Sequence, residues 1–301
     1  MESAGDGSLP IRLSRSAGQK LCTVDGDDRS RSIRWVLAWT ARRASADERA
    51  LRDRVLVKGD REVMDTTNIK ALCFDTGGTI LDWHTGMRTA LAAIGTRHGI
   101  ERDWAGLANE FRRRSLKLIV NHGEHAPATM TFDDAHREAL DKVLADNKLD
   151  VFTKDERHRL WWDTIHSLQC WPDFPDALLR LRKKFMCVSF TLLSFRIVMD
   201  TSRKNGVSWD AVISCEAIGK YKVLPEAYQT CAQFLQLDPS ECCMVACHNF
   251  DLNAAKACGY RTAFVRRPDE WGAEGPPDPE PDPRHDIAVA SFPELVEKLG
   301  A

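Results

Sequence analysis

The 301-residue sequence lacks a strong excess of charge and lacks any long apolar run. Its formal net charge of −2 gives no electrostatic reason to expect a nucleic acid or an acidic membrane as a partner. No apolar run approaches the roughly 20 residues that span a bilayer, and no apolar segment follows a basic start as in a secretory signal. With 43% hydrophobic and 29% charged residues, the composition is that of a soluble globular protein.

The ten cysteines lack the C-x-x-C spacing of zinc ribbons and thioredoxin-like sites. Four of them, Cys73, Cys187, Cys243 and Cys247, lie in short apolar runs that predict buried strands. Dispersed, buried thiols are typical of a reducing compartment. We therefore expect a cytoplasmic protein in which these cysteines are inert core residues.

Residues 1–63 differ from the rest of the chain in composition. They hold eleven arginines and many Ser, Asp and Gly residues, with a single segment that could form a helix. Acidic residues in this part argue against a mitochondrial transit peptide, which would be poor in acids. We expect a poorly ordered extension, with Met64 as the functional start.

From Met64 onward, the sequence predicts an α/β fold. Residues 69–74 predict a first strand, because the run is short, apolar and bounded by turn residues. Residues 85–168 carry apolar side chains at three- and four-residue spacing, which predicts a block of helices. Further strands are predicted at 186–193, 210–214, 242–247 and 261–265, with helices between them and a last strand and helix within 286–300.

Repeated β-α units of this kind predict a doubly wound, Rossmann-like parallel sheet core. The helical block would be a cap domain inserted after the first strand. We expect the core to comprise residues 64–84 and 173–301, and the cap residues 85–172.

Local signals predict some helix starts and loops. Thr131 with Asp134 and Thr153 with Glu156 have the spacing of helix N-terminal caps. Two prolines within 170–177 end the helical block. Residues 266–283 are rich in proline and acidic residues without any periodic pattern, so we expect a solvated loop there.

Polar residues follow the predicted strands at the edge where parallel sheets place their ligands. These residues are Asp75, Ser194, Lys222 and Asp251. Each also has a simpler interpretation, because Ser194 and Asp251 could cap helices and Lys222 could be a surface charge. Their occurrence together at one edge favours a functional site.

Four segments in order resemble the motifs of the haloacid dehalogenase superfamily of hydrolases, and more closely its L-2-haloacid dehalogenase (type II) branch. They are "FDTGGTILDW" (74–83), "LLSF" (192–195), "YKVLPEAY" (221–228) and "MVACHNFDLNAAKACGYRTAFV" (244–265). The resemblance covers about residues 69–300 and puts the helical block where that branch carries its cap.

The resemblance implies a role for each matching residue. Asp75 would be the nucleophile that forms a covalent ester, and Lys222 would keep it ionised. Asp251 would orient Lys222 or the hydrolytic water. Thr79 and Ser194 would donate hydrogen bonds to the anionic group of the substrate.

Gly77 stands where phosphatases of the superfamily have a second aspartate that acts as general acid and base. Glycine cannot protonate a departing alkoxide, whereas a halide leaves without a proton. In the fourth motif only His248 and Asn249 precede Asp251. The motif therefore provides few oxygen ligands for a Mg²⁺ ion. The resemblance therefore implies a dehalogenase of short 2-haloalkanoic acids that needs no metal or organic cofactor.

A departing halide needs a positive group, which in this branch is a cap arginine. Arg112 fits that place, with Arg113 and Arg114 beside it, although a basic solvated helix face is the alternative. Trp83 is expected to add an apolar wall, whereas Trp161 and Trp162 fit packing within the cap better.

Three departures from the branch leave the substrate open. Phe195 stands where an asparagine is usual, and Gly77 replaces an aromatic residue common in the branch. His248 would either assist the attack of water or cap the following helix. Two other functions also stay open: a phosphatase-like hydrolase of the same fold, and a catalytically silent superfamily member that acts as a binding protein. A homodimer is a further possibility.

Overall fold

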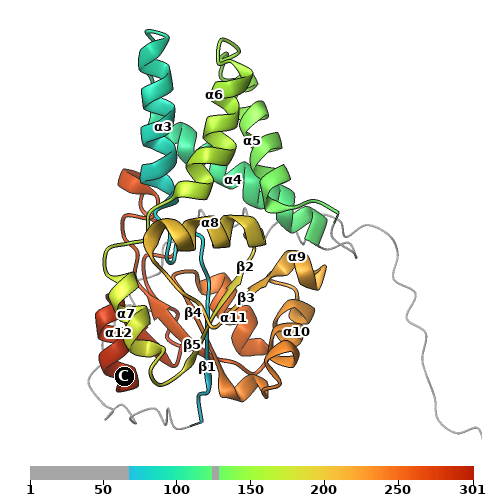
Figure 1. Cartoon of the computed structure of the whole chain (residues 1–301), viewed down its shortest axis with the longest axis vertical. Coiled ribbons are helices and arrows are strands. Elements are labelled where there is room, and N and C mark those ends of the chain that lie inside the picture. Colours follow the sequence, from blue (N-terminus) through green and yellow to red (C-terminus); the bar gives the residue numbers. More distant parts are fainter. Residues whose placement is uncertain (1–67, 124–128) are drawn as a thin grey trace, which may run out of the picture. The chain divides into compact units, whose positions relative to one another are not determined.

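A computed structural model describes residues 68–123 and 129–301 of the chain (Figure 1). The predicted extension 1–63 and its proposed boundary at Met64 lie outside the described residues. The described chain contains a six-stranded sheet with strand order β3-β2-β1-β4-β5-β6. Its strands are β1 (Ala71–Phe74), β2 (Met186–Thr191), β3 (Ala211–Ser214), β4 (Cys242–Ala246), β5 (Arg261–Val265) and β6 (Ile287–Val289).

Every neighbouring pair of strands in the sheet is parallel, so the predicted doubly wound α/β core is confirmed. The central strand β1 lies between β2 and β4, and its four residues are all buried. Burial on both faces explains why the strand sequences are continuously apolar rather than alternating. The predicted strand thiols are buried accordingly.

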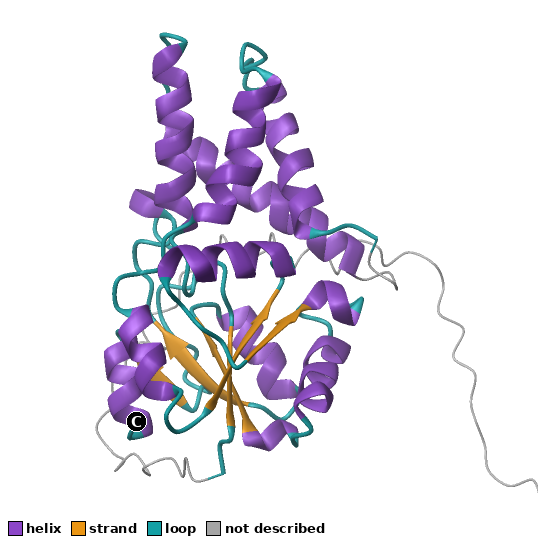
Figure 2. Ribbon diagram, in the orientation of Figure 1, coloured by secondary structure: helices purple, strands orange, loops and turns teal. Residues whose placement is uncertain are grey.

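Helices cover both faces of the sheet (Figures 1 and 2). Phe74 of β1 packs against Phe174 of α7 and Phe292 of α12 on one face. On the other face Phe190 of β2 packs against Tyr228 of α10. The core helices are α7 (Phe174–Leu181), α8 (Phe195–Asn205), α9 (Cys215–Ile218), α10 (Pro225–Leu235), α11 (Asn249–Ala257) and α12 (Phe292–Leu299), with the short turns η4 (Pro239–Glu241) and η5 (Gly272–Glu274).

The predicted helical cap lies between β1 and β2 in the chain. It consists of α3 (Trp83–Arg97), α4 (Trp104–Gly123), α5 (Phe132–Asp146), α6 (Lys154–His158), the π-helical turn η2 (Arg159–Thr164) and the 3-10 turn η3 (Ile165–Ser167). Capping boxes at Thr131 and Thr153 begin α5 and α6 as predicted. Helix α8 contacts both η3 and β3, and so connects the cap to the sheet (Figure 1). None of the helices in 68–123 and 129–301 is both long and apolar enough to cross a bilayer.

The two predictions about loops have different outcomes. The segment 170–177 does end the helical block, which stops at Ser167, although α7 begins within it at Phe174 with a proline in its first turn, where no backbone N–H is needed. The segment 266–283 is not a solvated loop throughout, because Arg267, Glu270 and Trp271 are buried. Arg267 forms a two-pronged ion pair with Asp173 at 2.9 and 3.0 Å, which holds this segment against the core.

His166 joins the cap to the core through two carboxylates. Its Nε2 lies 3.0 Å from Asp133 of α5, and its Nδ1 lies 2.7 Å from Asp200 of α8. The Trp162 ring stacks on the imidazole with the centroids 3.9 Å apart. Burial opposes the charged form of His166, but the two carboxylates outweigh it and raise its pKa above the ordinary value.

This raised pKa predicts a pH-dependent stability. The charged imidazole contributes fully below its unfolded pKa of about 6.5, and the contribution is lost as pH rises through the higher folded pKa. We expect the Tm of the full chain to fall more steeply above roughly pH 6.5 than that of His166→Asn. The measurement is calorimetry across this range. His158→Asn, at an exposed site of the same segment, is the control and should follow the unmodified chain. Parallel profiles for His166→Asn and the unmodified chain would contradict the prediction.

Candidate active site

Asp75 directly follows the central strand β1 and is buried. Its backbone N–H donates to Val245 O on the neighbouring strand, which fixes the residue at the carboxyl edge of the sheet. Its Oδ2 accepts a 2.8 Å hydrogen bond from the Thr79 hydroxyl. The turn after β1 therefore holds this carboxylate in one orientation.

Lys222 lies between two carboxylates, as its place after a predicted strand suggested. Its Nζ is 3.4 Å from Asp75 Oδ1 and 2.8 Å from Asp251 Oδ2. The other oxygen of Asp251 accepts a 2.6 Å hydrogen bond from the Tyr228 hydroxyl. Because both oxygens of Asp251 have donors, this carboxylate is engaged in positioning Lys222.

The charged groups around Asp75 favour its ionised form. Burial alone would raise the pKa of Asp75, but nearby Lys222, His248 and Thr79 hold it well below its usual range. Burial likewise opposes the ammonium of Lys222, and its two carboxylate neighbours raise the pKa of Lys222 above the ordinary value. The site thus contains a carboxylate that stays unprotonated and nucleophilic at neutral pH.

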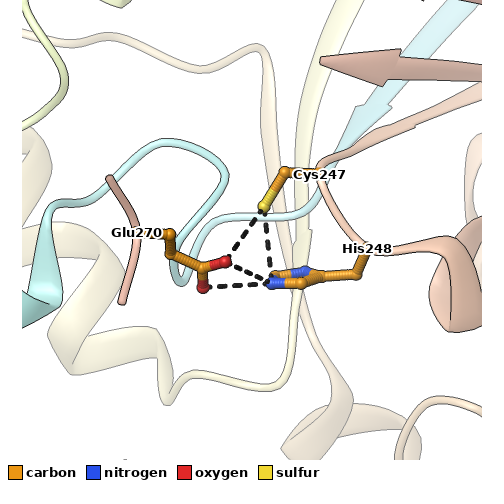
Figure 3. A group of neighbouring side chains, drawn as sticks. All are labelled: Cys247, His248 and Glu270. Carbon is orange, nitrogen blue, oxygen red and sulfur yellow. Dashed lines mark hydrogen bonds and ion pairs between the residues drawn. The ribbon is translucent and has the colours of Figure 1, made fainter. Parts of the chain in front are cut away.

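A second group of side chains, drawn in Figure 3, comprises Cys247, His248 and Glu270 and contacts Asp75 through His248. His248 Nδ1 lies 3.3 Å from Asp75 Oδ2, and His248 Nε2 lies 3.1 Å from Glu270 Oε1. The Trp83 indole N–H donates to the same Glu270 oxygen at 3.1 Å. The side chain of His248 does not cap α11, so the arrangement favours the first of its two predicted roles.

Glu270 reaches this position because Gly78 leaves room for it. A Cβ on Gly78 would overlap the Glu270 carboxylate, and Gly78 has a φ of +96°, which side chains rarely adopt. Burial opposes the charge of His248, but its acidic neighbours raise the pKa of His248 well above the ordinary value. Asp75, His248 and Glu270 therefore form an acid–imidazole–acid chain in the unreacted site.

Arg112 of α4 is the one arginine of the predicted trio that is buried. Its Nη2 donates to Gly77 O at 3.1 Å, and its guanidinium lies over the Trp83 ring at 5.5 Å. Arg113 instead pairs with Glu274 and Arg114 with Asp146. The alternative interpretation, a basic solvated face, therefore describes Arg113 and Arg114 but not Arg112.

Arg112 borders a small cavity between cap and core, with about 10 Å³ of free space. Among the residues that the structure describes, the Nε of Arg112 and the Nδ1 of His136 are buried without a hydrogen-bond partner. The other lining residues are Gly77, Leu81, Trp83, Phe111, Ile165, Leu168 and Leu193. The cavity is lined almost entirely by apolar atoms, and its free space is about that of one water molecule.

Not every predicted site residue lies at this cavity. Ser194 caps α8, since its Oγ accepts from Ile197 N at 3.2 Å. The backbone N–H of Phe195 donates to Glu216 at 2.9 Å, so it already has an acceptor, and Leu193 lines the cavity instead. Trp161 and Trp162 do not line it either: Trp162 stacks on His166, and Trp161 packs against the core cluster.

Four residues of the site escaped prediction from the sequence: Tyr228, Cys247, Glu270 and His136. Tyr228 lies within the third motif, six residues after Lys222, and a search for donors to Asp251 could have found it. Cys247 precedes His248 in the fourth motif. Glu270 and His136 had no usable signal, because each looks like an ordinary polar residue of a loop or a helix.

A capped hydrolase with a doubly wound core is the class of protein that this architecture defines. The family model for haloacid dehalogenase-like hydrolases matches residues 69–259, and the chain belongs to this family. It is 28% identical over 205 residues to (S)-2-haloacid dehalogenase 1 of Pseudomonas sp. (strain CBS-3), covering 66% of this chain and 85% of that protein.

Solved structures agree with this assignment. The defluorinating L-2-haloacid dehalogenase Rha0230 superposes with a TM-score of 0.71 at 34% identity, over 77% of this chain and 96% of that one. The L-2-haloacid dehalogenase PA0810 gives a TM-score of 0.71 at 25% identity, over 77% and 99%. The protein is thus a hydrolase related to L-2-haloacid dehalogenases.

Proposed function

We propose that the protein is a dehalogenase that hydrolyses short 2-haloalkanoic acids to 2-hydroxy acids and halide through an ester on Asp75. The observation that carries the proposal is Arg112, a buried cation with an unused N–H at a small apolar cavity beside Gly77. A buried cation of this kind can stabilise a departing halide. The enzymes that this chain resembles in sequence and fold are named for the same reaction.

In the first half-reaction, a carboxylate oxygen of Asp75 attacks C2 of the substrate as the carbon–halogen bond breaks. The electron pair of that bond leaves with the halide, which Arg112 receives, and C2 is inverted. No proton is transferred in this step, so the reaction does not need an acidic side chain at position 77, where Gly77 stands. Lys222 keeps Asp75 ionised beforehand.

In the second half-reaction, water attacks the carbonyl carbon of the Asp75 ester. Esterification removes the charge of Asp75, one of the two carboxylates beside the His248 imidazolium, and the Nδ1 proton that faced it is released to solvent. The neutral imidazole then takes a proton from the attacking water and passes it to the departing alkoxide. The regenerated Asp75 acid returns its proton to His248, and one proton has been released per turnover.

The geometry of Gly77 argues against a phosphatase. A Cβ at this position would lie 3.0 Å from Arg112 Nη2, so the guanidinium occupies the place that a second carboxylate would need. An aspartate here would pair with Arg112 rather than face a leaving group. The position is therefore adapted to holding a cation beside the nucleophile.

We expect Gly77→Asp to lower halide release by about 100-fold, because the new carboxylate would neutralise and displace Arg112. Gly77→Ala adds only the Cβ, which the flexible guanidinium can accommodate, and should lose about tenfold or less. Steady-state halide release measures both. Hydrolysis of p-nitrophenyl phosphate by Gly77→Asp with Mg²⁺ would contradict this account of the position.

His136 should contribute to substrate binding. Burial, followed by the charge of Arg112, lowers the pKa of His136 to about 3, so the ring is neutral and donates one N–H. His136→Phe keeps the stack on Phe132 but removes that donor, and we expect KM to rise about fivefold with kcat little changed. His136→Asn, which restores an N–H, should recover part of the affinity. An unchanged KM in His136→Phe would contradict this role.

The decisive experiment is halide release from 2-chloropropionate, chloroacetate and fluoroacetate by the full chain, with and without EDTA. We expect release that EDTA does not reduce, and faster turnover of two-carbon acids than of longer ones because the cavity is small. Fluoroacetate is included because a similar enzyme is a defluorinating one. No halide from any short haloacid would overturn the proposal.

A further inference from the structure

Cys247, His248 and Glu270 form a cluster whose thiol the proposed reaction does not use (Figure 3). Cys247 and His248 lie in the connection between β4 and α11, and Glu270 comes from the segment after β5, so two separate parts of the core meet here. All three side chains are buried. A thiol, an imidazole and a carboxylate are the three groups that most often bind zinc in proteins.

The distances between the three donor atoms match a metal site. His248 Nε2 lies 3.4 Å from Cys247 Sγ and 3.3 Å from Glu270 Oε2, and the sulfur lies 3.6 Å from that oxygen. A point central to such a triangle is about 2 Å from each corner, close to the 2.0–2.3 Å of zinc–ligand bonds. An ion there would keep one coordination position open.

Hydrogen bonds around the cluster already orient two of the three donors. His248 presents Nδ1 to the Asp75 carboxylate at 3.3 Å, which leaves Nε2 directed at the cluster. The Trp83 indole N–H holds the Glu270 carboxylate. A histidine held between a carboxylate and a metal is the usual outer-shell arrangement of zinc ligands. The exposed Phe250 ring stacks on His248, so the cluster lies near the surface on that side.

We propose that Cys247, His248 and Glu270 bind a thiophilic divalent cation, Zn²⁺ above all. Binding joins the ion to Cys247 Sγ, His248 Nε2 and one Glu270 oxygen, and both the thiol proton and the Nε2 proton of the imidazolium are released to solvent. The site lies next to the nucleophile without including it. The cluster is a binding site in its own right and does not depend on the proposed function.

One consequence does rest on the proposed function. An ion bound to His248 Nε2 and Glu270 would prevent these two residues from activating water. Asp75, Lys222 and Arg112 would not be bound to the ion. Zn²⁺ should therefore stop ester hydrolysis but permit one round of halide release. The cation would act as an inhibitor of turnover.

Cobalt(II) provides the deciding test, because its thiolate complexes absorb strongly in the near ultraviolet and visible ranges. We expect the EDTA-treated full chain to bind one Co²⁺ with a sulfur-to-cobalt charge-transfer band that Zn²⁺ abolishes. Cys247→Ser should lose the band, and Glu270→Gln should weaken binding by more than about tenfold. Cys258→Ser, at a partly buried thiol that contacts Pro225, is the matched control and should keep the band.

The outcomes separate the two proposals. If Cys247→Ser does not fold, the Co²⁺ affinity of Glu270→Gln decides in its place. No charge-transfer band at saturating Co²⁺, or a band that persists in Cys247→Ser, would overturn the metal site. Co²⁺ binding without any dehalogenation would leave the site standing and remove the proposed function. Dehalogenation that Zn²⁺ does not inhibit, in a protein that shows no charge-transfer band with Co²⁺, would remove the metal site and leave the proposed function standing.

Discussion

Asp75→Asn is expected to reduce halide release by about 10⁴-fold or more, because an amide cannot act as the nucleophile. Asparagine has the shape of aspartate and can still accept the hydrogen bond from Thr79, so the fold should persist. The Lys222–Asp251 ion pair also stays intact in this variant. The measurement is single-turnover halide release at substrate saturation, alongside circular dichroism of the purified variant.

Asp82→Asn is the matched control for this experiment. Asp82 caps α3 by accepting from Thr85 N, and asparagine caps helices about as well as aspartate. We expect it to retain activity within about twofold. Substantial halide release by Asp75→Asn would mean that another group attacks the substrate, and the assignment of the nucleophile would be withdrawn.

The second large effect is expected from His248→Asn. The ester on Asp75 should form normally but hydrolyse about 10²- to 10⁴-fold more slowly, because no base faces the attacking water. Each site should therefore release one halide in a rapid phase and then nearly stop. Mass spectrometry of the quenched protein should show the carboxyalkyl group of the substrate attached, through C2, to the peptide that contains Asp75.

Glu270→Gln tests the Asp75–His248–Glu270 chain of contacts at the end opposite to Asp75. Glutamine keeps the shape but loses the charge that faces His248, so we expect the same accumulation of ester to a smaller degree. His158→Asn, an exposed histidine of the cap, should turn over normally. If His248→Asn turns over slowly and no ester is trapped, the first half-reaction is the step that is slowed. That result would contradict the role given to His248.

Much of the fold could be predicted from the sequence, because strand and helix patterns are local. The short apolar run before Asp75 and the run before His248 both form parallel neighbours in the sheet. The rule that ligands gather at the carboxyl edge of a sheet then placed Asp75 and Lys222 in one site, and the two residues do lie in contact. Their catalytic roles stay predictions until the variants are measured.

The site residues that were not predicted, such as Glu270, are positioned by tertiary contacts that local sequence patterns do not encode. The acidic residues of 266–283 look alike in sequence, and nothing local shows that Glu270 is the one that turns inward. Its burial comes from contacts with Trp83 and His248, which are about 187 and 22 positions away. The prediction of Cys247 as a buried thiol agrees with its burial, but the sequence did not show that His248 and Glu270 lie beside it.

The fit of Glu270 against Gly78 links two distant positions of the chain. Because a Cβ at 78 would overlap the carboxylate, a residue larger than glycine at 78 would displace Glu270 from its place beside His248. Glycine at 78 is therefore needed wherever a glutamate at 270 occupies this place, whereas position 270 can be exchanged alone. The family match ends at residue 259, before Glu270, so an inventory of active-site residues restricted to the matched region would omit the partner of His248.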